Sequence, residues 1–282
     1  MKPVHLPSTL DELWKILAEN PGIGIYAGGT DLLPRIRKGM RPPRALVCLE
    51  RIGELKGVRE EGEKFFLGSC ATHGALLSNA SVRSHFPVLA AALATLGSPH
   101  IRNMGTLGGN IVTASPAGDT LPPLFVLEAE IELRSRNSQR RVPVGDFIKG
   151  PGRVDLAADE IVAGVWLRKE PTPRIHHFEK VGQRNALAIS VVSMAAVISL
   201  SKGRLIESAH LAWGSVGPTI VTSSVVERFL KDKTLDVETL SGAAELVREA
   251  VSPIDDVRAT AAYRREIAGN LLLRLTDMST NR

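Results

Sequence analysis

The sequence predicts an α+β protein whose strands and helices fall into three successive groups. Two observations carry this prediction. Short apolar runs bounded by glycine and proline fill the first half of the chain, and two long helical segments end it. Between them, Pro171-Thr172-Pro173 interrupts both helix and sheet, which marks a linker. We therefore expect a domain boundary near residue 172.

The first group, residues 1–52, is typical of a compact α/β unit. An amphipathic helix begins at Ser8, its predicted N-cap, and ends at Asn20-Pro21-Gly22. Predicted strands at 23–27 and 45–49 follow it.

The second group, residues 53–172, mixes hairpins and helices. Its expected elements are a hairpin at 58–69, helices at 74–77, 87–96 and 121–127, a hairpin at 130–144 and a strand at 161–167. Beyond the linker, we expect residues 173–282 to form an antiparallel sheet with helices. The predicted strands are 188–200 and 205–213, and the predicted helices are 235–251 and 256–275.

Composition excludes several classes of protein. Aromatic residues make up 4% of the 282 residues, and the net charge of +5 comes from scattered Arg and Lys, which argues against nucleic-acid binding. Two cysteines, Cys48 and Cys70, can supply neither a disulfide framework nor a cluster-binding set, and no metal site is expected. No apolar stretch reaches the ~20 residues of a membrane span, and no signal core is visible. The chain is therefore expected to be cytoplasmic.

Two glycine-rich segments carry most of the functional signal. The first glycine turn is Ala27-Gly28-Gly29-Thr30-Asp31, and the second glycine segment is Gly105-Thr106-Leu107-Gly108-Gly109-Asn110. Glycine lets a ligand approach the backbone closely, and a curled run of N–H donors, helped by a following helix, attracts anions. Together the two segments suit the two phosphates of a dinucleotide.

Neither segment has the Gly-x-Gly-x-x-Gly spacing of a nicotinamide-binding turn or the Gly-Lys-Ser/Thr of a P-loop. The second is the more specific, because it combines backbone donors with a Thr hydroxyl and an Asn amide. Asp119 follows in a proline-bounded loop, where its carboxylate either accepts hydrogen bonds from a sugar chain or simply forms a turn.

At these residues the chain resembles the FAD-binding medium subunits of molybdenum hydroxylases, the family that includes carbon monoxide dehydrogenase, 4-hydroxybenzoyl-CoA reductase and the flavin domain of xanthine dehydrogenase. Four segments carry the resemblance in order and spacing: 27–33, 101–111, 114–119 and 178–184. It covers essentially the whole chain.

The resemblance implies a fold and a site. The fold is a PCMH-type FAD-binding domain, 1–172, of two α/β subdomains (about 1–52 and 53–172), followed by a C-terminal domain, 173–282, of three-stranded antiparallel sheet with helices. The cofactor is FAD, and no residue of this chain is expected to be catalytic. The residues expected at FAD are Tyr26, Ala27, Gly28, Gly29, Thr30, Asp31, Leu32, Leu96, Gly105, Thr106, Gly108, Gly109, Asn110, Ser115, Asp119, Ile161, Val162 and Lys180.

The resemblance also implies a role as an electron-transfer subunit. Substrate would react at a molybdenum cofactor on a large partner subunit. Electrons would pass through [2Fe-2S] clusters on a small partner subunit to FAD, and then to NAD, quinone, ferredoxin or dioxygen. The expected assembly is a dimer of heterotrimers.

Two features differ from the family. Ala188-Ile189-Ser190 stands where many relatives have Asp-Ile-Ala, and the cysteine-rich insertion of 4-hydroxybenzoyl-CoA reductase is absent. Two alternatives stay open: a self-contained FAD-dependent oxidoreductase of the same flavin-binding superfamily, and a non-catalytic nucleotide-binding assembly module.

Overall fold

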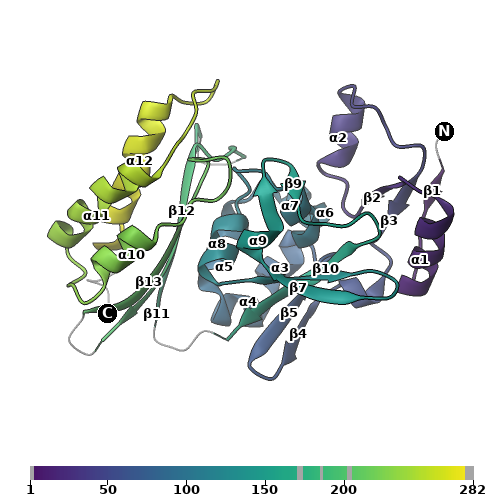
Figure 1. Ribbon diagram of the computed structural model, residues 1–282, viewed down its shortest axis with the longest axis horizontal. Coiled ribbons are helices and arrows are strands. Elements are labelled where there is room, and N and C mark those ends of the chain that lie inside the picture. Colours follow the sequence, from purple (N-terminus) through teal and green to yellow (C-terminus); the bar gives the residue numbers. More distant parts are fainter. Residues whose placement is uncertain (1–2, 170–173, 185–186, 202–204, 277–282) are drawn as a thin grey trace. The chain divides into compact units, whose positions relative to one another are not determined.

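The computed structural model divides by its contacts into two compact units (Figure 1). The first unit takes in residues up to 79, 98–114 and 129–169, and the second takes in 80–97, 115–128 and the chain beyond 169. The structure describes residues 3–169, 174–184, 187–201 and 205–276. The predicted linker at 171–173 lies outside these ranges.

A small parallel sheet opens the first unit. Its strand order is β1 (Val4–His5), β3 (Leu46–Cys48), β2 (Gly24–Tyr26), and helix α1 (Leu10–Glu19) packs Leu13 against its core. The N-cap of α1 is Thr9, so the prediction of Ser8 was wrong by one residue. Thr9 accepts from the N–H of Glu12, and the Glu12 carboxylate accepts from the N–H of Ser8 in return.

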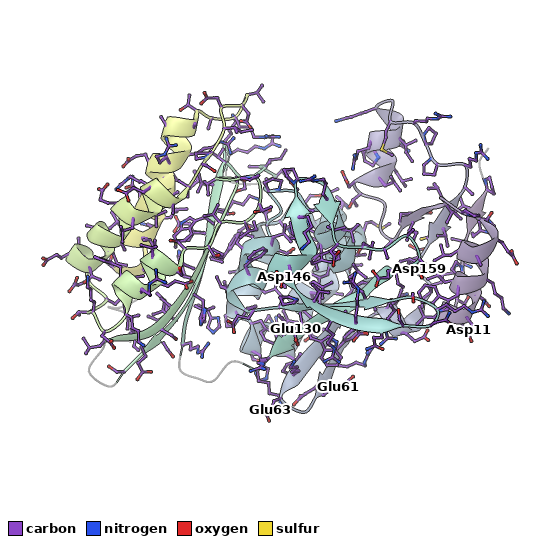
Figure 2. All side chains as sticks on the ribbon, viewed as in Figure 1. Asp11, Glu61, Glu63, Glu130, Asp146 and Asp159 are labelled. Atoms are coloured by element: carbon purple, nitrogen blue, oxygen red, sulfur yellow. The ribbon has the colours of Figure 1, made fainter. Side chains whose placement is uncertain are left out.

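A five-stranded antiparallel sheet forms the rest of this unit's framework, with order β4-β5-β10-β6-β7. It consists of both predicted hairpins and, at its centre, the strand predicted at 161–167. Glu61, at the end of β4, and Glu63, in the turn to β5, are exposed (Figure 2). The strands are β4 (Val58–Glu61), β5 (Lys64–Gly68), β6 (Glu130–Arg134), β7 (Gln139–Pro143) and β10 (Ile161–Arg168).

Short elements complete the first unit. They include a hairpin that the sequence pattern did not predict, formed by β8 and β9. The elements are α2 (Leu32–Arg37), η1 (Gly53–Leu55), α3 (His73–Ser78), α6 (Pro99–Met104), α7 (Leu107–Thr113), α9 (Val144–Phe147), β8 (Ile148–Gly150) and β9 (Arg153–Val154).

The second unit is built on a three-stranded antiparallel sheet, β11 (Arg174–Val181), β12 (Val192–Leu200) and β13 (Ile206–Gly214). Trp213 anchors the helical side, donating its indole N–H to the backbone of Ala268 at 3.1 Å. The helices there are α10 (Ser224–Leu230), α11 (Val237–Ala250) and α12 (Ala261–Leu273). The predicted sheet with helices is confirmed.

Helices from the middle of the chain also pack on this sheet (Figure 1): α5 (Pro87–Thr95) contacts β11, and α8 (Leu121–Val126) contacts β12 and β13. With α4 (Ala80–His85), they belong to the second unit. Both faces of β12 are thereby covered, which explains why it is buried over Val192–Ile198. Over the described ranges, no helix is long and apolar enough to cross a membrane.

Candidate functional site

The first glycine turn follows β2 directly and offers open backbone donors. The N–H groups of Gly28, Gly29 and Thr30 meet no hydrogen-bond acceptor among the described residues. A side chain at Gly28 would overlap the carbonyl oxygen of Met104, at the end of α6, and Gly29 has a φ of +68°. Glycine is therefore required at both positions, and the turn is held tightly against α6.

The second glycine segment is a capped helix start, because α7 begins inside it. Thr106 is the N-cap and accepts from the N–H of Gly109 at 3.2 Å. The N–H of Gly108 donates to Ser69 O at 2.8 Å, and that of Leu107 donates to Ala71 O at 3.1 Å. The expected second open nest is thus closed by internal hydrogen bonds. Gly109 is nevertheless exposed, so no side chain covers the outer side of the helix start at this position.

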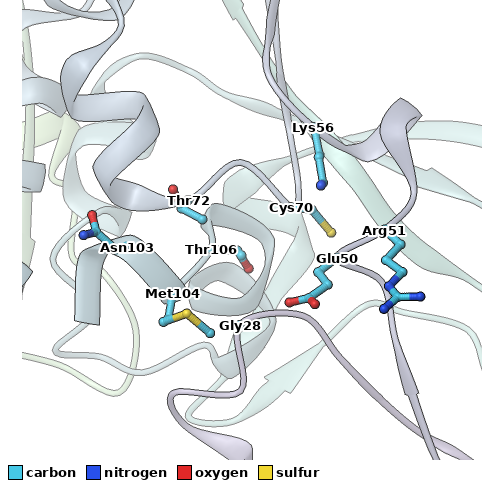
Figure 3. Close-up of a pocket in the computed structure, with 9 residues that line it drawn as sticks. All are labelled: Gly28, Glu50, Arg51, Lys56, Cys70, Thr72, Asn103, Met104 and Thr106. Carbon is cyan, nitrogen blue, oxygen red and sulfur yellow. The ribbon is translucent and has the colours of Figure 1, made fainter. Parts of the chain in front are cut away.

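A cavity of about 260 Å³ lies against both glycine segments within the first unit (Figure 3). Gly28 and Thr106 line it, so the structure brings the two predicted segments together. The three charged residues of its wall, Glu50, Arg51 and Lys56, were not predicted, because charged residues after a strand are typical of ordinary surface. The other lining residues are Cys70, Thr72, Asn103 and Met104.

Burial shifts the pKa of one cavity residue, Cys70, and of two residues adjacent in sequence to the lining residues or the first glycine turn, Tyr26 and His73, in the direction that favours the neutral form. Burial raises the pKa of Cys70 to about 11, and it also raises the pKa of Tyr26. Burial, with a smaller effect of the nearby Arg102 charge, lowers the pKa of His73 to about 4. At neutral pH the charge on the cavity wall therefore comes from Glu50 and the two cations, Arg51 and Lys56.

A buried ion pair distinguishes the second unit. Lys180, on β11, lies 2.6 Å from Asp119 Oδ2, and the two side chains are 7% and 9% exposed. Lys180 Nζ also donates to the carbonyl oxygen of Thr95 at 3.4 Å. Burial raises the pKa of Asp119, and Lys180 opposes that shift. No described residue donates to Asp119 Oδ1, which leaves a buried acceptor without a partner.

The remaining predicted residues are distributed over the two units. In the first unit, Ile161 and Val162 are buried in β10. The Asp31 carboxylate, also in the first unit, accepts a hydrogen bond from the Thr113 hydroxyl at 3.3 Å. In the second unit, Leu96 is buried at the end of α5, and the Ser115 hydroxyl accepts from the N–H of Ala117 at 3.3 Å.

Comparison with family models identifies the class of protein to which this fold and these segments belong. Residues 1–167 match the model described as the FAD binding domain in molybdopterin dehydrogenase, and residues 177–278 match the CO dehydrogenase flavoprotein C-terminal domain. The chain belongs to this family of FAD-binding subunits of molybdenum-containing oxidoreductases. The predicted family, fold class and cofactor are confirmed.

Individual relatives agree along nearly their whole length. The chain is 32% identical to the xanthine dehydrogenase FAD-binding subunit of Escherichia coli O157:H7, over 92% of this chain and 89% of the relative. It is 27% identical to the carbon monoxide dehydrogenase medium chain of Hydrogenophaga pseudoflava, over 96% and 94%. Among solved structures, quinoline 2-oxidoreductase from Pseudomonas putida 86 superposes with a TM-score of 0.93 at 28% identity, covering 99% of this chain and 96% of that one.

Proposed function

We propose that this chain binds FAD and transfers electrons within a multi-subunit molybdenum hydroxylase. Electrons arrive from [2Fe-2S] clusters on a small partner subunit and leave for an external acceptor: NAD, quinone, ferredoxin or dioxygen. Bound FAD supplies the redox chemistry at its flavin ring, and the protein binds and orients it. The observation that carries the proposal is the first glycine turn of a chain of this family: three of its N–H groups are open, and Gly28 lines a cavity.

The pyrophosphate is assigned to the glycine segments. The N–H groups of Gly28, Gly29 and Thr30 donate to its oxygens, and hydrogen bonds to charged acceptors are the stronger kind. Gly109 gives the cofactor access to the start of α7 without a side chain in the way. The neighbouring positions complete this part of the assignment: Tyr26, Ala27, Asp31, Leu32, Gly105, Thr106, Gly108 and Asn110.

The flavin half is assigned to the polar pair of the second unit. Asp119 Oδ1 is a buried acceptor that lacks a donor, and an N–H or O–H of the flavin half of FAD supplies one. Lys180 lies 2.6 Å from the other oxygen, Oδ2, and opposes the burial that raises the pKa of Asp119. Ser115 is assigned as a polar contact, and Leu96, Ile161 and Val162 as apolar contacts.

The names of the relatives, which describe FAD subunits and medium chains of dehydrogenases, support a role beside partner subunits. The proposed complex contains a large molybdenum-cofactor subunit and a small [2Fe-2S] subunit, as a cytoplasmic dimer of heterotrimers. Within this chain, the proposed domains are 1–172, in two subdomains that meet near residue 52, and 173–282.

Anaerobic mixing tests the electron-transfer role. FAD bound to the isolated full chain should stay oxidised in the presence of xanthine, an aromatic CoA ester or carbon monoxide. FAD in the assembled complex should bleach with the complex's own substrate, because electrons then reach it through the partners. The absorbance of the flavin is the readout. Bleaching in the isolated chain would favour a self-contained oxidoreductase, and a chain that binds no flavin would leave only the assembly module.

A further inference from the structure

The cavity beside the first glycine turn carries three charged side chains that the family assignment leaves without a role: Glu50, Arg51 and Lys56. None of them forms a side-chain hydrogen bond or ion pair with any residue that the structure describes. Charged residues on the adjoining sheet behave differently, since Lys169 pairs with Glu60 at 2.6 Å. All three side chains are exposed, and a carboxylate and two cations at one cavity suit a ligand that has both hydrogen-bond donors and negative charge.

The topology places Glu50 at a specific position relative to the turn. Strands β2 and β3 run parallel, with Tyr26 opposite Cys48, so their carboxyl ends lie at the same edge of the sheet. The glycine turn follows β2 at that edge, and Glu50 follows β3 there, with helix α2 between the two strands in sequence. In dinucleotide-binding α/β units, a carboxylate about 20 residues after the phosphate-binding turn holds the ribose hydroxyls. Here the arrangement recurs although the usual glycine fingerprint is missing.

The close-up of the cavity agrees with this placement. In the view of Figure 3, the Glu50 carboxylate lies between Gly28 and the Cys70 sulfur, and the Lys56 amine lies on the other side of that sulfur. A carboxylate only accepts hydrogen bonds and repels phosphate, so it suits a hydroxyl pair. Lys56 and the open N–H groups of the turn suit the negative diphosphate.

We propose that Glu50 binds the ribose hydroxyls in the adenosine half of FAD and that Lys56 lies beside the diphosphate. This inference rests on the proposed FAD binding and assigns the cavity to the adenosine half. It makes Glu50 a specificity residue: it selects a ribonucleotide with a free 2′-hydroxyl.

Competition with fragments of the cofactor tests the proposal in the full chain. ADP and 2′-deoxy-ADP are each titrated against bound FAD, whose fluorescence reports displacement. The wild type should bind ADP about tenfold more tightly than 2′-deoxy-ADP, the effect expected of one hydrogen bond to a charged group. Glu50→Ala should bind both equally. Lys56→Met should weaken both by the same factor and keep the preference.

Glu54→Ala is the matched control, because Glu54 is also an exposed glutamate of this segment but does not line the cavity. It should keep the wild-type preference for ADP. A wild type that binds FAD and treats the two competitors alike overturns the role of Glu50 and leaves the proposed function intact. The same holds for a folded Glu50→Ala that keeps the preference. A chain that binds no FAD overturns both proposals.

Discussion

Gly28→Ala should release FAD and destabilise the first unit. The new methyl group would overlap the carbonyl oxygen of Met104, which belongs to the rigid end of α6. Forcing a group into packed backbone costs about 1–3 kcal/mol or more. The displaced turn would also lose its proposed hydrogen bonds to the charged pyrophosphate, each worth about 1.5–3 kcal/mol, so FAD affinity should fall at least about a hundredfold.

Thermal unfolding and equilibrium titration with FAD measure these two effects separately. Gly53→Ala is the control, because a Cβ at Gly53 meets no atom within 4 Å. That variant should keep the stability and the FAD affinity of the wild type. Wild-type FAD affinity in Gly28→Ala would mean that the cofactor does not depend on this turn.

Lys180→Met should produce the second large effect, in the second unit. It removes the countercharge of a carboxylate that is 9% exposed, and breaking a buried ion pair costs about 3–5 kcal/mol. The variant should therefore unfold at markedly lower urea concentration at neutral pH. Asp119→Asn combined with Lys180→Met should recover much of the loss, because no charge is then left buried.

The defect should depend on pH with a definite sign. Burial raises the pKa of Asp119 in the folded chain, and Lys180→Met removes the charge that opposes this shift. The folded variant therefore binds a proton more readily than the unfolded chain, so its stability falls as pH rises above the ordinary carboxyl pKa. Urea midpoints at pH 5 and pH 8 measure the effect. A defect that is equal at both pH values, or that persists unchanged in the double variant, would assign Lys180 a packing role only.

Local sequence patterns predicted many of the elements but not which elements pack together. The hairpins at 58–69 and 130–144 were correct because alternating apolar residues and turn residues determine them locally. Helix α10 was missed, since a seven-residue helix gives little periodic signal. The packing of α5 and α8 on the C-terminal sheet depends on contacts across long stretches of chain. The pattern of one segment does not encode such contacts.

The candidate site, too, could be predicted from the sequence only in part. The glycine segments and Asp119 were visible as residue patterns. The pairing of Asp119 with Lys180, 61 residues away, could be seen only in three dimensions. Glu50 and Lys56 were overlooked because charged residues after a strand are usually solvated. Only the parallel pairing of β2 with β3 gives Glu50 its position beside the turn.

The affinity of the chain for FAD relative to FMN tests the central claim most directly. Both flavins share the ring and one phosphate, so the comparison isolates the second phosphate and the adenosine that the turn and cavity are assigned to bind. Fluorescence titration at fixed ionic strength should give at least about a hundredfold preference for FAD, as expected when several hydrogen bonds to a charged group are lost with FMN. Equal affinities would contradict the assignment of the first glycine turn and its cavity to the pyrophosphate and adenosine of FAD.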